Sequence, residues 1–113
     1  MKDLNWVEEF SGSVTICDPQ GVILDMNQAA AKAYADDGGR DLIGSNILDC
    51  HPDLARAKVE NMLSTQEANV YTVVQDGLKK MIYQTPWYRN GQYAGFVELF
   101  FEIPADVPHF IRA

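Results

Sequence analysis

The last third of the chain carries two turn signals that constrain the fold more than any other feature of the sequence. Asp76-Gly77 and Asn90-Gly91 are residue pairs typical of two-residue β-hairpin turns. The segments around them are rich in β-branched and aromatic residues, which favour strands. The sequence therefore predicts three consecutive antiparallel strands, over about 69–76, 79–88 and 93–102.

The beginning of the chain predicts a second antiparallel pair. Val14 and Ile16 alternate with less apolar residues in a β-branched run. They are followed by Asp18-Pro19-Gln20-Gly21, a turn sequence in which proline presets one position and glycine supplies a permissive φ. Apolar residues return over 22–24, so this segment is predicted to be the returning strand.

Helical signals fill the middle of the chain. Asn27 is a good N-cap for an alanine-rich helix over 28–35. A short helical piece is expected over 40–43, and Pro52 stands at the first position of a third helix that continues to about residue 64. The predicted order is therefore β-β-α-α-α-β-β-β.

Strands grouped at both ends of a chain, with helices between them, indicate the α+β class. We expect one five-stranded antiparallel sheet with helices packed on one face. The predicted parts are an N-terminal amphipathic segment over 1–10, a globular domain over 11–103 and a C-terminal tail over 104–113.

Charge and composition narrow the class of partner. The 113 residues include 9 Lys and Arg against 16 Asp and Glu, a net charge of −7, and the basic residues are scattered. Nucleic acid and anionic membranes are therefore poor partners.

No apolar run approaches the ~20 residues that cross a bilayer, and the N-terminus has no signal-peptide core, so we expect a cytoplasmic protein. Cys17 and Cys50 form no CxxC motif, and His51 and His109 lie far apart, so no metal site is predicted.

Several short stretches follow one another in a specific order. They are Ile16-Cys17-Asp18 with Gly21, Ile23 to Asn27 with Ala29-Ala30 and Tyr34, Asp41-Leu42-Ile43-Gly44, His51-Pro52-Asp53, and Asn90-Gly91 with Gly95-Phe96-Val97. Together they resemble the PAS domain family over about residues 11–103. The resemblance implies a sensory or regulatory signalling module, without intrinsic catalysis, that acts on an output protein. It also implies an unidentified small molecule in a pocket between the sheet and the middle helices, and frequent homodimers.

The resemblance also bears on cofactors. Flavin-binding photoreceptor members carry Gly-x-Asn-Cys where this chain has Gly44-Ser45-Asn46-Ile47, so the thiol that forms the flavin adduct is replaced. His51 is a weak candidate for a haem ligand, with Cys50 beside it as an alternative thiolate. No cofactor is predicted, and haem or non-covalent flavin remain the alternatives.

Alternation along the strands gives candidate pocket residues. Ile16 shares a face with Val14, and Tyr83 shares one with Met81 and Thr85. We expect an apolar cavity between the sheet and the helix that Pro52 begins, with the Tyr83 hydroxyl as its main polar group. The candidate ligand-binding residues are Ile16, Tyr34, Asn46, Ile47, Met62, Leu63, Tyr83, Val97 and Leu99.

The last strand is apolar on both sides, whereas a sheet with one face in water alternates more clearly. We therefore expect a covered outer face. Apolar residues at helical spacing before the first strand predict an amphipathic helix over about 2–10 that helps to cover it. The predicted homodimer uses both surfaces, and its candidate interface residues are Leu4, Val7, Phe10, Phe96 and Phe100.

Two other classes of function remain open. A tightly filled core would favour a ligand-free dimerisation or protein-interaction scaffold. An isomerase-like enzyme would need a buried acid, and Glu98 is the acid flanked by an apolar strand. No other catalytic constellation stands out, so no enzyme is predicted. Members of the family often continue from the last strand into a helix, but Pro104 predicts that this chain does not.

Overall fold

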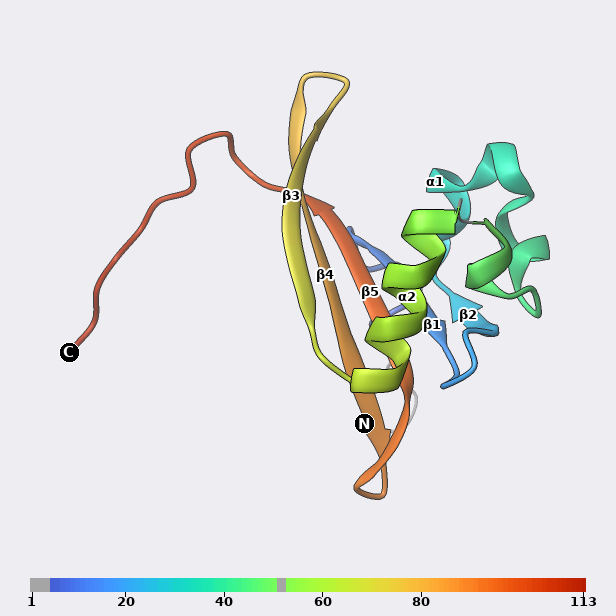
Figure 1. Cartoon of the computed structure of the whole chain (residues 1–113). Coiled ribbons are helices and arrows are strands. Elements are labelled where there is room, and N and C mark those ends of the chain that lie inside the picture. Colours follow the sequence, from blue (N-terminus) through green and yellow to red (C-terminus); the bar gives the residue numbers. More distant parts are fainter. Residues whose placement is uncertain (1–4, 51–52) are drawn as a thin grey trace.

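The computed structural model describes residues 5–50 and 53–113 of the chain (Figure 1). Short 3₁₀ helices are labelled η. The elements are β1 (Ser13–Cys17), β2 (Ile23–Met26), α1 (Gln28–Ala33), η1 (Ala35–Asp37), η2 (Gly39–Leu42), η3 (Ile47–Cys50), α2 (Asp53–Thr65), β3 (Asn69–Gln75), β4 (Leu78–Arg89) and β5 (Gln92–Glu102). The middle of the chain is divided into more and shorter helical pieces than the sequence predicts.

The five strands form one antiparallel sheet in the order β2-β1-β5-β4-β3. Figure 1 shows α2 lying across one face of this sheet, with α1 and the 3₁₀ helices beside it. We call this the inner face, and on β5 its residues are Phe96, Glu98 and Phe100. The opposite, outer face carries Val97, Leu99 and Phe101. The predicted α+β fold, a five-stranded antiparallel sheet with helices on one face, is confirmed.

Both predicted hairpin turns lie where the sequence puts them. Asp76 and Gly77 join β3 to β4 with φ angles of 54° and 77°, and Asn90 and Gly91 join β4 to β5 with 52° and 79°. Two successive positive φ angles are those of a type I′ turn, whose twist matches that of the flanking strands. These turns set the register of the three long strands.

The buried side chain of Asn27 joins three parts of the chain. Its Oδ1 accepts hydrogen bonds from Ala30 N and Val14 N, both at 3.0 Å, so it caps α1 and holds β1 at once. Its Nδ2 donates to Val7 O and Gly12 O, both at 2.9 Å. The side chain is 1% exposed and uses every donor and most of its acceptor capacity. The predicted N-cap is confirmed, and the contacts with β1 and the N-terminal segment are additional.

The N-terminal segment is not the helix that the sequence predicts. Residues 6–9 form a turn, and Leu4 lies outside the described residues. Asn27 Nδ2 binds the Val7 carbonyl, and the N–H of the first residue of α1 binds the Glu8 carbonyl at 3.1 Å. These carbonyls are therefore used by tertiary contacts instead of the i→i+4 bonds of a helix. A groove is lined by Val7 on one side and by Val14 of β1 on the other. The N-terminal segment therefore runs over the outer face of β1.

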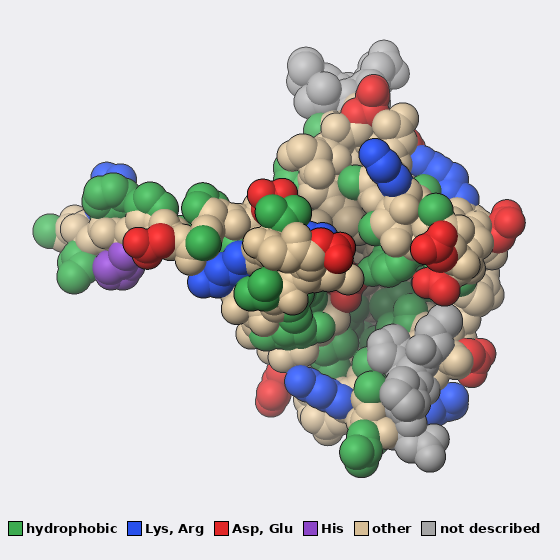
Figure 2. All heavy atoms as spheres, turned by 90° about the horizontal axis from the view of Figure 1, so that it is seen from above, with side chains coloured by type: hydrophobic (Ala, Val, Ile, Leu, Met, Phe, Trp, Pro, Cys, Tyr) green, Lys and Arg blue, Asp and Glu red, His purple; other side chains and the backbone are tan. Residues whose placement is uncertain are grey.

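The C-terminal residues 104–113 form neither helix nor strand, in keeping with the expectation from Pro104. They extend away from the body of the molecule (Figures 1 and 2). Phe110 and Ile111 are exposed on this tail.

Candidate functional site

A cavity of about 590 Å³ lies between the inner face of the sheet and the helical layer. β1, β2, β4 and β5 form one wall, and α2, η3 and the segment from Tyr34 to η2 form the other. Seen from above, the surface is hollowed, with hydrophobic side chains inside the hollow (Figure 2). The lining residues are Thr15, Cys17, Ile23, Met26, Tyr34, Asp37, Leu42, Ile47, Val59, Met62, Gln84, Phe96, Val97 and Glu98.

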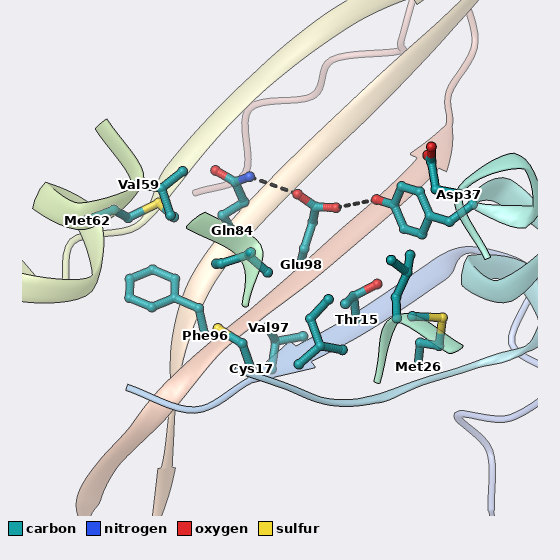
Figure 3. A pocket seen from close by; sticks show the side chains of 14 residues that line it. Thr15, Cys17, Met26, Asp37, Val59, Met62, Gln84, Phe96, Val97 and Glu98 are labelled. Atoms are coloured by element: carbon teal, nitrogen blue, oxygen red, sulfur yellow. Dashed lines mark hydrogen bonds between the residues drawn. The ribbon is translucent and has the colours of Figure 1, made fainter. Parts of the chain in front are cut away.

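One end of the cavity is apolar. Val59 and Met62 of α2 lie opposite Phe96 of β5 (Figure 3). Met62 and Phe96 are buried in one hydrophobic cluster with Cys17 and Leu63. Burial raises the pKa of the Cys17 thiol, so this sulfur stays protonated and behaves as a small apolar group.

The other end of the cavity holds a hydrogen-bonded polar cluster. Tyr34 Oη donates to Glu98 Oε1 at 2.9 Å, and Gln84 Nε2 donates to Glu98 Oε2 at 2.8 Å (Figure 3). Asn69 Nδ2 donates in turn to Gln84 Oε1 at 2.9 Å. We call Tyr34, Asn69, Gln84 and Glu98 the Glu98 cluster. It connects the C-cap of α1 with three strands, because Tyr34 directly follows α1 and the other members lie in β3, β4 and β5.

Strand register explains why these side chains meet. β4 pairs Gln84 with Glu98, and β1 pairs Thr15 with Glu98 on the other side. Directly paired residues in an antiparallel sheet point to the same face. Glu98 is therefore flanked by two polar side chains in the middle of the sheet. The Tyr34 ring reaches it from the C-terminal end of α1.

The electrostatics of the cluster fix the direction of its main hydrogen bond. Burial, followed by the nearby Glu98 carboxylate, raises the pKa of Tyr34 well above its ordinary value. The pKa of Tyr71, on the neighbouring strand β3, is raised by the same two causes. Tyr34 therefore stays protonated at neutral pH, and its hydroxyl donates to the carboxylate.

The structure brings together only part of the predicted pocket. Tyr34, Ile47 and Met62 line the cavity, and Leu63 packs in the adjoining hydrophobic cluster. Val97 also borders the cavity, although its strand position, paired with Ile16, belongs to the outer face. Asn46 instead holds a loop, because its Nδ2 donates to Gln20 O at 3.0 Å and its Oδ1 accepts from Leu48 N at 2.9 Å. The predicted residues that lie at the cavity are therefore mainly those of the helical layer.

The prediction of which strand face points inward is wrong. Ile16 lies in the groove on the outer side of β1, and Tyr83 is 41% exposed. Tyr83 pairs with Leu99, and both belong to the outer face of the sheet. Tyr83 is therefore not the polar group of the cavity. The physical reason is that β5 is apolar on both faces, and Glu98, the acid in the middle of the strand, points into the cavity instead of toward water.

The same reversal changes the predicted dimer surface. Phe96 is 4% exposed and lines the cavity, and Phe100 pairs with the buried Ile82 on the inner face. Neither ring belongs to the outer face. Phe10 does approach that face: a β-carbon on Gly12 would lie 3.0 Å from the Phe10 ring and 3.1 Å from Phe101 Cβ.

Sequence reasoning missed four polar or charged lining residues as pocket groups: Thr15, Asp37, Gln84 and Glu98. The available signal was Glu98 itself. A single acid within an apolar strand needs either water or buried partners. Tyr34, one of the predicted ligand-binding residues, is such a partner.

The described charges of the lining are negative, which disfavours the anionic groups of haem and of flavin nucleotides. Among the described residues, no His, Lys or Arg lines the cavity, whereas two carboxylates do. These carboxylates would repel haem propionates or a flavin phosphate. His51 lies outside the described residues, as does the side chain of Cys50.

Metal-binding clusters and membrane-spanning helices are both absent from the described part of the chain. No group of three or more His, Cys, Asp or Glu is placed to hold a metal ion there. No helix in that part is long and apolar enough to span a membrane.

A family model of the PAS fold matches residues 7–66, which is more than half of the chain. The chain belongs to the PAS family. This confirms the resemblance carried by the turns, caps and strands. No curated protein matches the sequence significantly.

Solved PAS structures share the fold. The Aer2 receptor of Vibrio cholerae, described as a dual PAS-heme oxygen sensor, is 19% identical with a TM-score of 0.65, over 82% of this chain and 95% of that one. The PAS domain of BvgS from Bordetella pertussis is 16% identical with a TM-score of 0.62, over 87% and 81%. A sensory box sensor histidine kinase from Vibrio cholerae is 16% identical with a TM-score of 0.58, over 87% and 86%. These PAS domains come from sensors and receptors, and at such identities the similarity shows the fold.

Proposed function

We propose that this PAS domain is a sensory module that binds a small molecule in the cavity and passes the change to an output protein. The observation that carries the proposal is the cavity itself. Its volume of about 590 Å³ lies within the range of small-molecule sites, and an apolar lining with a few convergent polar groups is typical of them. A ligand-free scaffold would fill this space with side chains.

β5 is suited to carry the signal. Successive residues of a strand point to opposite faces, so Glu98 faces the cavity while Val97 and Leu99 flank it on the outer face. A ligand that contacts the Glu98 cluster would move the central strand of the sheet. The outer face would then be displaced directly, without a separate relay.

We further propose a homodimer through the outer face. Val70, Tyr83 and Leu99 are paired across β3, β4 and β5 in one row on this face. Val70 and Tyr83 are both exposed, at 49% and 41%. A contiguous exposed apolar row of this kind marks an interaction surface. A second copy would cover it, next to the N-terminal segment with Val7 and Phe10.

Native mass spectrometry of the protein purified from its own host tests ligand binding. The proposal predicts a non-covalent small molecule on the wild-type chain. Val59→Phe, which fills the apolar end of the cavity, should lose that mass. Leu54→Phe, a matched control on the exposed side of α2, should keep it. A wild-type chain of bare mass, or a ligand retained by a folded Val59→Phe variant, would overturn the proposal.

A further inference from the structure

The charges that line the cavity are all of one sign. Asp37 and Glu98 contribute two carboxylates, and none of the described lining residues is Lys, Arg or His. The ion pairs among the described residues are Glu8–Arg40, Asp49–Arg56 and Glu60–Arg56, so neither cavity carboxylate has a cationic partner there. Glu98 is stabilised by neutral donors alone.

Glu98 can still accept another hydrogen bond. A carboxylate offers about four lone-pair positions, and the Tyr34 hydroxyl and the Gln84 amide occupy two of them. In Figure 3 the carboxylate points into the cavity between these two partners, and Asp37 lies beyond the tyrosine ring. A cationic group placed there would meet Glu98, and Asp37 adds a second negative charge at the rim of the same cavity.

A second observation also points to a missing partner. Thr15, which is paired with Glu98 across β1 and β5, lines the same part of the cavity. Its Oγ1 is buried and has no hydrogen-bond partner among the described residues. Buried hydroxyls without a partner are uncommon, and this oxygen could accept a hydrogen bond from a donor group next to Glu98. An amine, with two or three N–H groups, could serve both oxygens.

The remainder of the cavity requires an apolar body. Val59, Met62 and Phe96 lie at the end away from Glu98 (Figure 3). A small inorganic cation or a fully polar metabolite would leave this surface in contact with water. An amphiphilic molecule with its charge at one end matches both ends of the cavity.

We propose that the cavity selects a small organic cation, a primary or secondary amine with an apolar body, whose ammonium group binds Glu98 while the body packs against Met62 and Phe96. The proposal rests on the proposed function and adds the chemical class of the ligand. An anion would meet the Glu98 carboxylate in a cavity whose other described charge is also negative, and a neutral molecule would leave the charge of Glu98 without a counter-ion.

Matched probe series test the charge preference. Phenylpropylamine, phenylpropanol and phenylpropanoate share one carbon skeleton and differ in charge, as do their cyclohexyl counterparts. Titration calorimetry should show that each amine binds at least about tenfold more tightly than its alcohol, since hydrogen bonds between charged groups are the stronger ones. The carboxylates should bind weakest.

Three variants locate the preference. Glu98→Gln should bring the affinity of the amine close to that of the alcohol. Asp37→Asn should reduce the preference to a smaller extent, and it leaves the Glu98 cluster intact. Glu102→Gln removes an exposed carboxylate at the end of the same strand and should change nothing.

Equal affinities for amine and alcohol, tighter binding of the carboxylates, or an amine preference that persists in both Glu98→Gln and Asp37→Asn would overturn the cation proposal. So would the absence of binding by every probe. Ligand binding as such is judged separately, by the bound mass in native spectra and its loss in Val59→Phe. The two proposals can therefore fail independently.

Discussion

Gly95 shows how a single residue fixes the central pair of strands. Its φ is 127°, and a β-carbon there would lie 1.9 Å from the Cys17 carbonyl oxygen. The same carbonyl accepts a hydrogen bond from Trp87 Nε1 at 3.1 Å. The backbone of β1 and the indole of β4 therefore meet at a position that only glycine allows.

Gly95→Ala should lower the free energy of unfolding by about 3 kcal/mol or more, because the clash adds to the cost of a positive φ. Gly77→Ala is the matched control, since its φ is also positive but its β-carbon meets nothing within 4 Å. That variant should lose only about 1 kcal/mol. Urea denaturation measures both losses, and equal losses would refute the close approach.

Tyr34 gives the cavity a measurable pH response. Its pKa is raised in the folded state by burial and by Glu98, whereas an unfolded tyrosine ionises near pH ~10. Above that pH the unfolded chain loses this proton while the folded chain keeps it, so the folded state becomes less favoured. The stabilisation that goes with the raised pKa of Tyr34 is fully present below pH ~10 and decreases as the pH rises further.

Wild-type stability should therefore fall more steeply between about pH 9.5 and 11 than that of Tyr34→Phe, which has no proton to lose. Thermal unfolding across this range measures the two slopes. Tyr83→Phe serves as the control, because it removes an exposed hydroxyl outside the cavity. Parallel curves for wild type and Tyr34→Phe would contradict the buried tyrosine–carboxylate pair.

At the scale of elements, Asn27 joins α1, β1 and the N-terminal segment through four hydrogen bonds. Asn27→Asp keeps the shape and the acceptor but removes both donors. The new carboxylate would face the Val7 and Gly12 carbonyls. We expect a loss of about 3 kcal/mol, since the buried Gly12 carbonyl loses its partner, the Val7 carbonyl keeps only Phe10 N, and a buried carboxylate faces both. Chemical denaturation checks this value against Asn61→Asp, an exposed change on α2 that should be nearly neutral.

The elements that could be predicted are those with a local cause. Two type I′ turns follow from Asp76-Gly77 and Asn90-Gly91, and α1 follows from the cap of Asn27. The N-terminal turn could not be predicted, because the contacts that replace its helical bonds come from residues far along the chain. The spacing of Val7 and Phe10 fits a helix, but it contains no information about these distant contacts.

The candidate site was predictable from its helical side only. Met62 lines the cavity from the apolar stripe of α2, and Tyr34 and Ile47 line it from the C-cap of α1 and the start of η3. β5 carries large apolar residues at both parities, so alternation cannot choose the inner face. In the sequence, Glu98 has the pattern of a solvent-exposed residue, because its partners Tyr34 and Gln84 lie far from it along the chain.

At the scale of the whole molecule, the outer face should control the oligomeric state. Tyr83→Arg puts a charge in the middle of the exposed row with Val70 and Leu99. We expect a wild-type dimer, and a Tyr83→Arg monomer because the charge would be desolvated at the interface. Leu54→Arg, on α2 at the other side of the sheet, should remain a dimer. Sedimentation velocity decides, and a monomeric wild type or a dimeric Tyr83→Arg would exclude this interface.

The central claim is that a small molecule from the host occupies the cavity of this PAS domain. Methionine methyl signals report on it directly, because Met26 and Met62 line the cavity whereas Met81 shares the outer face with Tyr83. The measurement is a carbon–proton spectrum of methyl-labelled protein, before and after addition of a small-molecule extract of the host. We predict shifts of the Met26 and Met62 signals, with Met81 changed less. Shifts of Met81 alone, or of none of the three, would contradict the account.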